Sequence, residues 1–317
     1  MKCATSILST RYSLNVRAKL HKQLHKLSSI SNLDPSIQIH KKSLTAPEEF
    51  WGNVGKGIAW SKQPEAVLDA SKAPFFTWFK GGEMNTCYNC VDRHIADGFG
   101  EQDAIIFDSP VTNTIKKITY NQLLEQISVF AGLLVAQGVE KGDRVVIYMP
   151  NVPEASVAML ACARIGAIHS VVFGGFAAPE LATRIRDSTP KVIICASCGI
   201  DGAKIVEYKP LLDAAIELAS DTHKVEKCIV FQRDQMLASM VEGRDIDWAE
   251  GVKTVTTPVK DCVPVASNHP LYILYTSGTT GAPKGVLRDN AGHAVALKWT
   301  MENVYGMKPG EVFWSAR

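Results

Sequence analysis

The feature that most constrains the fold is a regular alternation of short apolar runs and amphipathic segments over residues 105–231. Residues 144–149 read RVVIYM, and residues 168–173 read IHSVVF. Strands that are apolar along their whole length are buried on both faces, as in parallel sheets. Apolar runs that alternate with helical patterns indicate βαβ units. The sequence therefore predicts an α/β fold with a doubly wound, largely parallel sheet.

The same alternation predicts individual elements. Thr119 and Gln122 form a capping box at the start of an apolar stripe that ends near Gly138. Further helices are expected over residues 155–165, 179–187 and 211–219, and further strands over residues 191–195, 227–231 and 271–275. The polar segment 245–268 is interpreted as a connection. Sheets of this kind bind ligands at the carboxyl ends of their strands, so the turns that follow the strands are the places to search for a site.

The N-terminal segment differs in charge from the rest of the chain. Its first 33 residues contain six basic residues and no acidic one, and apolar residues recur in it at helical spacing. A basic, acid-free and serine-containing N-terminus is typical of a mitochondrial transit peptide. We expect residues 1–43 to be a leader that binds the import machinery and directs the chain to the mitochondrial matrix. A disordered basic tail is the alternative.

Charge and hydropathy exclude other classes of protein. The net charge is 34 − 32 = +2, and without the six basic residues of the leader it becomes 28 − 32 = −4. We therefore expect no nucleic-acid partner, because nucleic-acid binding needs a basic surface. The longest apolar stretch, residues 157–175, is interrupted by Arg164 and His169. No membrane span is expected.

The eight cysteines are too sparse and too irregularly spaced for a disulfide scaffold. Two C-x-x-C pairs occur, Cys87 with Cys90 and Cys195 with Cys198. More than one hundred residues separate the two pairs, whereas the pairs of a zinc ribbon lie about 15–20 residues apart. We interpret the cysteines as small buried apolar residues in a reducing compartment, and we expect no metal site.

A loop rich in glycine and hydroxyl groups follows the apolar residues 271–275. Residues 276–285 read TSGTTGAPKG, with four hydroxyl side chains, three glycines and one lysine. Glycine lets backbone N–H groups approach a phosphate closely, and hydroxyls and lysine bind its oxygens. We predict a site for a nucleotide polyphosphate, with an ordinary polar turn as the alternative. It is not a Walker A loop, because Lys284 precedes a glycine and an apparent return strand.

The residues of this loop resemble the signature of a known enzyme family. Residues 275–285 resemble the phosphate-binding signature of adenylate-forming enzymes, which include acyl-CoA synthetases, luciferases and the adenylation domains of peptide synthetases. Further stretches resemble the short-chain acyl-CoA synthetase branch, and they are residues 89–94, 141–145, 148–150, 159–167 and 171–176. The resemblance extends over residues 47–314. Over residues 261–314 it is greatest to a mitochondrial member that prefers propionate, and the N-terminal motifs disfavour a luciferase-like enzyme.

The resemblance implies a domain arrangement. Residues 44–104 would form an acetyl-CoA-synthetase-like N-terminal segment, and residues 105–317 an incomplete N-terminal large domain, the AMP-binding or adenylation domain. Members of the family continue well beyond residue 314, where the acyl pocket, the adenine and ribose contacts, a Mg²⁺-binding glutamate and the adenylating lysine would lie. We therefore expect a C-terminally truncated chain that has little or no activity alone. The choice between acetate and propionate stays open.

The resemblance also implies an activity, that of an ATP-dependent short-chain acid–thiol ligase. A carboxylate, propionate or acetate, attacks the α-phosphate of ATP with Mg²⁺ assisting, and the thiol of coenzyme A then displaces AMP from the acyl-adenylate. The resemblance assigns the β- and γ-phosphates to Thr276, Ser277, Gly278, Thr279, Thr280, Gly281 and Lys284, with Lys284 neutralising their charge. A non-catalytic fragment that binds coenzyme A or pairs with another protein is the alternative.

Two segments are expected to bind coenzyme A. The first is Phe173, Gly174 and Gly175, where the Phe173 ring can stack on the coenzyme's adenine; a core phenylalanine before a glycine turn is the alternative. The second is Asp201, Gly202, Ala203 and Lys204.

The second segment departs from the family pattern, because relatives often carry arginines there for the coenzyme's phosphates. Only Lys204 keeps the positive charge, and Asp201 repels a phosphate unless the backbone makes the contact. Arg184 and Arg186 lie near in sequence, and a solvated place on a helix explains them as well.

Overall fold

The computed structural model describes residues 35–276 and 283–314 of the 317. The predicted transit peptide up to residue 34, and Ser277, Gly278, Thr279, Thr280 and Gly281 of the glycine-rich loop, lie outside the described residues. The chain divides into two compact units, residues 1–56 and 57–317.

The described part of the first unit consists of two helices, α2 (Pro35–Thr45) and α3 (Pro47–Gly55). Pro47 suits the first turn of α3, because the N–H groups of a first turn have no acceptor within the helix and proline lacks only that N–H. An ion pair of 2.7 Å between Lys42 Nζ and a Glu49 carboxylate oxygen links the two helices. The predicted boundary between residues 43 and 44 falls inside α2. This boundary and the one at residues 104 and 105 stay predictions.

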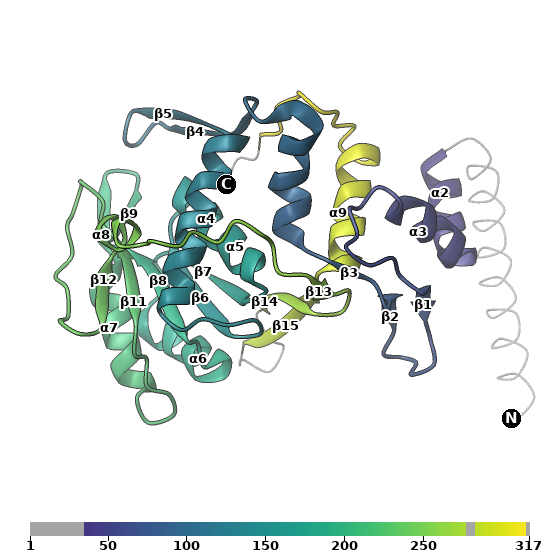
Figure 1. Ribbon diagram of the computed structural model, residues 1–317. Coiled ribbons are helices and arrows are strands. Elements are labelled where there is room, and N and C mark those ends of the chain that lie inside the picture. The colour runs from purple at the N-terminus through teal and green to yellow at the C-terminus, as the bar shows by residue number, and fades with distance from the viewer. Residues whose placement is uncertain (1–34, 277–282, 315–317) are drawn as a thin grey trace, which may run out of the picture. The chain divides into compact units, whose positions relative to one another are not determined.

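The second unit is built around a seven-stranded sheet, which runs from β12 at the left of Figure 1 to β15. Its strands, in spatial order, are β12 (Asp245–Asp247), β11 (Cys228–Phe231), β8 (Val192–Ala196), β6 (Arg144–Met149), β7 (Ile168–Phe173), β14 (Pro270–Thr276) and β15 (Lys284–Asp289). All neighbours are parallel except β15, which is antiparallel to β14. The predicted α/β fold with a largely parallel sheet is confirmed.

Helices cover both faces of this sheet. They are α4 (Tyr120–Ala136), α5 (Pro153–Ile165), α6 (Ala178–Ser188), α7 (Tyr208–Ala219) and α8 (Trp248–Lys253). The chain crosses from β6 to β7 in one direction and from β7 to β8 in the other. Because such crossovers are right-handed, α5 and α6 lie on opposite faces. Helix α4 packs against α5 and α6 against α7, so the sheet is doubly wound as predicted.

The capping box at α4 is confirmed in both directions. The Gln122 backbone N–H donates to the Thr119 hydroxyl at 3.3 Å, and the Thr119 N–H donates to the Gln122 side chain at 3.0 Å. This reciprocal pair satisfies two of the N–H groups that a helix start leaves without partners. The helix therefore begins at the residue that the sequence indicates.

The remaining described elements of this unit lie outside the seven-stranded sheet. They are β1 (Ala66–Asp69) paired with β2 (Thr77–Lys80), β3 (Glu83–Met84) paired with β13 (Val265–Ala266), β4 (Asp103–Ser109) paired with β5 (Thr114–Thr119), β9 (Cys198–Asp201) paired with β10 (Lys204–Glu207), the π-helical turns η1 (Tyr88–Asp92) and η2 (Ile95–Phe99), and α9 (Ala291–Asn303).

The interpretation of residues 245–268 as a connection is wrong in part. The segment supplies the edge strand β12, helix α8 and strand β13. The buried Asp245 is compensated by Lys209 at 2.8 Å and by Arg244 at 2.7 Å, so a polar residue occupies a strand of the sheet. Trp248 stacks on Phe130 with ring centroids 3.8 Å apart, which anchors α8 to α4.

The core lies between the sheet and its helices. Strands β6, β8 and β11 contribute side chains that are almost wholly buried. Five of the seven described cysteines are buried as expected, whereas Cys90 is exposed and Cys262 is partly exposed. Among the described residues there is no helix with the length and apolar character needed to span a bilayer.

Candidate functional site

The carboxyl ends of the parallel strands meet at one edge of the sheet, and those predicted site residues that the structure describes follow or end these strands. The chain leaves β6 for one side of the sheet and β7 for the other, which makes the region between these strands a topological switch point. Phe173 ends β7 and Thr276 ends β14, the strand beside it. The expected coenzyme turn and phosphate loop therefore start from neighbouring strands.

Strands β14 and β15 form the hairpin that carries the glycine-rich loop. Thr276 pairs with Lys284 at its open end, and Tyr275 pairs with Gly285 next to it. The predicted return strand after Lys284 is thus present. Thr276 and Lys284 are both exposed. The register fixes the two ends of the loop side by side, so that the Lys284 ammonium group lies on the same hairpin end as the hydroxyl of Thr276.

Helix α6 contacts this hairpin beside its open end, at Tyr275. The Tyr275 hydroxyl donates to a carboxylate oxygen of Asp187 at 2.5 Å. Burial, together with this carboxylate, raises the pKa of Tyr275, so the phenol stays protonated and remains a donor. The guanidinium carbon of Arg184 lies 5.4 Å from the centre of the Tyr275 ring and 4.7 Å from that of Phe176.

Arg184 thereby joins two parts of the candidate site, because Phe176 follows the β7 turn and Tyr275 precedes the phosphate loop. The solvated helix position allowed for Arg184 is wrong, since this residue is buried. Its neighbour Arg186 is part-exposed and pairs with Asp221 at 3.3 Å. Neither arginine is an unpaired surface charge.

The turn after β7 presents Phe173 to solvent. This side chain is 63% exposed, so the alternative of a core phenylalanine is wrong. Its ring centre lies 5.5 Å from that of Phe176. The buried Tyr148 hydroxyl donates to the Phe176 carbonyl at 2.9 Å, and burial raises the pKa of Tyr148 to about 12. The hydrogen bond from Tyr148 fixes the turn, and the exposed Phe173 ring is accessible to a planar ligand.

The segment around Asp201 and Lys204 forms the tip of the β9–β10 hairpin. These two residues pair with each other, and Gly202 and Ala203 make the two-residue turn between them. All four are exposed. Because β9 follows β8 after a single residue, the hairpin also stands at the carboxyl edge of the sheet.

Tyr208 brings the two expected coenzyme segments together. A Cβ atom at Gly174 would lie 2.4 Å from the Tyr208 hydroxyl oxygen, and one at Gly199 would lie 2.2 Å from it. Both distances are far below a normal contact. The ring therefore packs directly against the backbone of the β7 turn and of the β9–β10 hairpin, and only glycine fits at either place.

Sequence reasoning missed Tyr208 and Asp187, and it left the role of Arg184 open. Tyr208, Arg184 and Asp187 act through contacts with segments that are distant along the chain. The sequence signal for this packing was the two glycines, Gly174 and Gly199, because a glycine inside or just after a strand often marks a place where another group lies close to the backbone. Nothing in the sequence pattern indicates which side chain approaches.

Two family patterns match this chain. Residues 37–90 match the acetyl-coenzyme A synthetase N-terminus, and residues 93–316 match the AMP-binding enzyme family. The chain belongs to the AMP-binding enzyme family. The second match contains every residue that was expected to contact a phosphate or the coenzyme.

Several relatives of this AMP-binding chain bear similar names. It is 52% identical over 275 residues to the acyl-CoA synthetase short-chain family member 3, mitochondrial, of Homo sapiens and of Rattus norvegicus, which covers 86% of this chain and 40% of each relative. It is 43% identical over 282 residues to the propionate–CoA ligase of Salmonella typhimurium, covering 88% of this chain and 44% of that one. The chain thus spans less than half the length of these relatives.

The fold has a solved counterpart. The acetoacetyl-CoA synthetase from Streptomyces lividans superposes with a TM-score of 0.76 at 25% sequence identity, over 86% of this chain and 41% of that structure. The short-chain acyl-CoA synthetase resemblance expected from the sequence is confirmed by these relatives.

Proposed function

We propose that this AMP-binding chain contributes the phosphate and coenzyme contacts of an ATP-dependent ligase that joins a short-chain carboxylate to coenzyme A. One observation carries the proposal. The hairpin end closed by Thr276 and Lys284 and the turn that presents Phe173 leave neighbouring strands at the same edge of the sheet. A site that holds ATP and coenzyme A together needs this adjacency.

The roles of the residues follow from their chemistry. Thr276 and Lys284, with Ser277, Gly278, Thr279, Thr280 and Gly281 between them, hold the β- and γ-phosphates through backbone N–H groups, hydroxyls and one ammonium charge. Mg²⁺, when bound with the nucleotide, would neutralise part of its charge. With the phosphates held, the carboxylate attacks the α-phosphate and pyrophosphate leaves. Lys284 stabilises the charge that develops on pyrophosphate.

The second half-reaction uses the β7 turn and the β9–β10 hairpin. Phe173 stacks on the coenzyme's adenine, with Gly174 and Gly175 allowing close approach. Gly202 and Ala203 offer backbone N–H groups to the coenzyme's phosphates, Lys204 offers a positive charge, and Asp201, which pairs with Lys204, contributes through its backbone. The coenzyme's thiol then attacks the acyl carbonyl of the acyl-adenylate and AMP leaves.

The names of the relatives support propionate or acetate as the carboxylate, since one relative is called a propionate–CoA ligase and others belong to a short-chain family. Other relatives are named mitochondrial, which supports mitochondrial import through residues 1–33 and a place in the matrix. A reporter protein fused to residues 1–40 should reach the matrix. A diffuse cytosolic signal would contradict this part of the proposal.

Hydrogen exchange with ligand tests the two binding regions separately. ATP with Mg²⁺ should slow amide exchange in residues 276–285, and adenosine should not, because adenosine has no phosphates. Coenzyme A should slow exchange in residues 173–177 and 199–207. The assignment would be contradicted if either ligand protected only residues outside these segments, or if it protected none.

A turnover assay separates the ligase from the non-catalytic alternative. Carboxylate-dependent formation of propionyl-CoA supports catalysis by the chain itself. Saturable coenzyme A binding without product favours a coenzyme-binding fragment, and it leaves the ligand assignments in place.

A further inference from the structure

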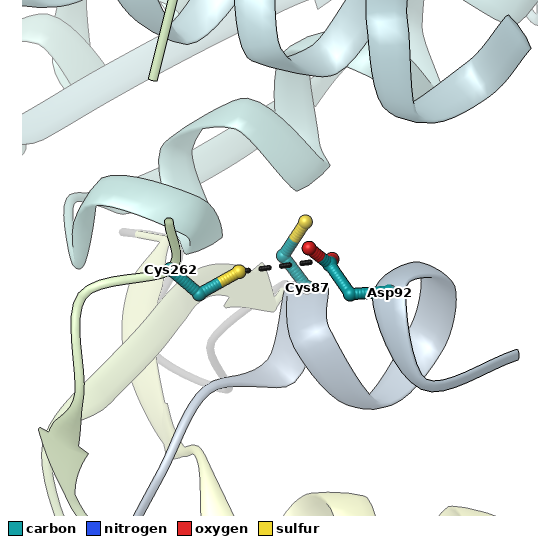
Figure 2. Close-up of side chains that lie close together, drawn as sticks. All are labelled: Cys87, Asp92 and Cys262. Carbon is teal, nitrogen blue, oxygen red and sulfur yellow. Dashed lines mark hydrogen bonds between the residues drawn. The ribbon is translucent and has the colours of Figure 1, made fainter. Parts of the chain in front are cut away.

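Two thiols and a carboxylate that belong to no part of the candidate site lie close together (Figure 2). The Cys87 and Cys262 sulfurs and a carboxylate oxygen of Asp92 are all within 4.8 Å of one another. Cys87 and Asp92 lie at the start and the end of η1, and Cys262 lies in the irregular segment between α8 and β13. The cluster therefore joins parts of the chain that are 170 residues apart.

The composition of this cluster suggests a metal site, and Arg164 argues against one. Its Nη1 donates to a carboxylate oxygen of Asp92 at 3.0 Å, to the Cys262 sulfur at 3.2 Å and to the Cys87 sulfur at 3.5 Å. One cationic nitrogen thus contacts all three candidate ligands. Arginine stays protonated in proteins, and this one has no exposed side-chain surface. A metal ion would have to displace a buried charge from its partners.

Arg164 is held firmly in this place. Its second terminal nitrogen donates to the other Asp92 oxygen at 2.9 Å, and Nε donates to the Val259 carbonyl at 2.8 Å. The same second nitrogen also donates to the Lys260 carbonyl. These bonds attach the segment that carries Cys262 to α5, so the two sulfurs are kept near each other independently of any bond between them.

The surroundings make the two thiols unequal. The pKa of Cys87 is lowered by the hydrogen bond from the Cys262 thiol and by the nearby charge of Arg164. The pKa of Cys262 is raised, because its proton is shared with Cys87 and its thiol is partly buried. The pair titrates together, and Cys87 is the sulfur that loses its proton first. A thiol with a lowered pKa beside a second, partly exposed thiol is the arrangement that disulfide formation needs.

We propose that Cys87 and Cys262 are a site of oxidation by hydrogen peroxide, which joins them in a disulfide. Peroxide reaches the partly exposed Cys262 once the proton shared with Cys87 has moved to Cys87, and it converts the Cys262 thiolate to sulfenic acid. The hydroxide that is released takes the proton from Cys87 and becomes one water. The Cys87 thiolate attacks the Cys262 sulfur, the S–O bond breaks, and hydroxide leaves with a proton as a second water. Two thiols lose two hydrogens and two electrons, and one peroxide becomes two waters.

The reaction fits the geometry and the charge of the cluster. The sulfurs must move from within 4.8 Å to the bonded distance of about 2.05 Å. The Arg164–Asp92 pair is neutral as a whole and does not depend on the thiols, so it persists in the oxidised chain. The disulfide would close a loop of well over one hundred residues and raise the Tm.

Peptide mapping tests the proposal on the whole chain. The folded protein is treated with graded hydrogen peroxide, its remaining thiols are alkylated, and the digest is analysed by mass spectrometry. A Cys87–Cys262 peptide should appear, lighter than its two parts by about 2 Da and lost on reduction. Its rate of formation should rise with pH across the neutral range, because the reacting species are thiolates.

Matched variants make the result specific. Cys90→Ser removes the other thiol of the same C-x-x-C motif and should leave the rate unchanged. Cys87→Ser should abolish the bridge and leave Cys262 sulfenic acid that reacts with dimedone. Arg164→Lys, checked for folding by circular dichroism, should slow bridge formation at least severalfold and move its pH profile upward, a shift that a merely structural residue would not produce.

Three outcomes would overturn the proposal. They are a Cys87–Cys90 bridge in place of the Cys87–Cys262 bridge, oxidation of Cys262 to sulfinic acid while Cys87 stays a free thiol, and two unmodified thiols at the highest peroxide concentration at which the chain stays folded. None of these results depends on whether the chain binds ATP or coenzyme A.

Discussion

Individual residues of this chain show how charge is accommodated away from water. Arg164 has no exposed side-chain surface and is satisfied by one carboxylate, two sulfurs and backbone carbonyls. Lys209 and Asp245 form a second buried pair at 2.8 Å. The free energy needed to desolvate such a pair is about as large as the free energy gained from its attraction and hydrogen bonds. Removal of one partner, however, leaves a buried charge without compensation.

Replacing Arg164 with methionine should therefore lower the free energy of unfolding by about 3–5 kcal/mol, because Asp92 and two backbone carbonyls lose their donor. Urea unfolding followed by circular dichroism measures the loss. Arg186→Met, on α6 and part-exposed, is the control and should cost about 1 kcal/mol or less. Equal losses for the two variants would contradict the role of Arg164.

His169 predicts how stability depends on pH. It is buried in β7, its Nδ1 has no hydrogen-bond partner within the described residues, and burial lowers its pKa to about 4. The unfolded pKa is about 6.5. Because the folded value is the lower one, the unfolded state takes up the proton first as the pH falls. The stabilising contribution is full above pH 6.5 and is lost between about pH 6.5 and 4.

Between pH 7 and pH 5 this residue alone should lower the free energy of unfolding by about 2 kcal/mol. Urea titrations at the two pH values measure it. In His169→Gln the loss should shrink by that amount, while the contribution of His293, whose pKa burial also lowers, remains. An unchanged pH dependence in the variant would show that His169 does not carry the effect.

At the scale of elements, Tyr208 couples helix α7 to the turn after β7 and to the β9–β10 hairpin. The close approach of its hydroxyl to Gly174 and Gly199 leaves no room for another atom. The ring also lies against Tyr148, with centroids 4.9 Å apart. Together these contacts set the relative position of the two segments that are proposed to bind coenzyme A.

Gly199→Ala should lower the free energy of unfolding by about 1–3 kcal/mol, because the new methyl group overlaps the Tyr208 ring. The matched test is a double-mutant cycle with Tyr208→Ala, in which the alanine at position 199 should cost much less. Additive losses in the cycle would mean that the two residues do not interact. Calorimetry or urea unfolding gives the four values.

The elements also show what sequence reasoning can reach. The strands β6, β7, β8 and β11 were predicted because an apolar run without alternation reports burial on both faces. The short strand β12 was missed, since its buried Asp245 is compensated by Lys209 and Arg244 from other parts of the chain. The phosphate hairpin was predicted from its local motif, and the Phe173 turn from the family resemblance. Tyr208 was not predicted and the contacts of Arg184 were not, because long-range packing leaves no local pattern.

For the molecule as a whole, the central claim concerns the edge of the sheet where β7 and β14 end. The phosphate hairpin and the coenzyme turn start there side by side, and Arg184 contacts the aromatic rings of both. Among the residues that the structure describes, Lys284 supplies a positive charge at the open end of the phosphate hairpin. Binding of a polyphosphate there should depend on its charge.

Calorimetric titration of pyrophosphate and of ATP with Mg²⁺ tests this claim most directly. Lys284→Ala should weaken both ligands about tenfold or more, since a charge-assisted hydrogen bond contributes about 1.5–3 kcal/mol. Lys116→Ala, an exposed lysine in β5 away from the central sheet, should change neither affinity. Equal affinity of the unaltered chain and Lys284→Ala for both ligands would contradict the account.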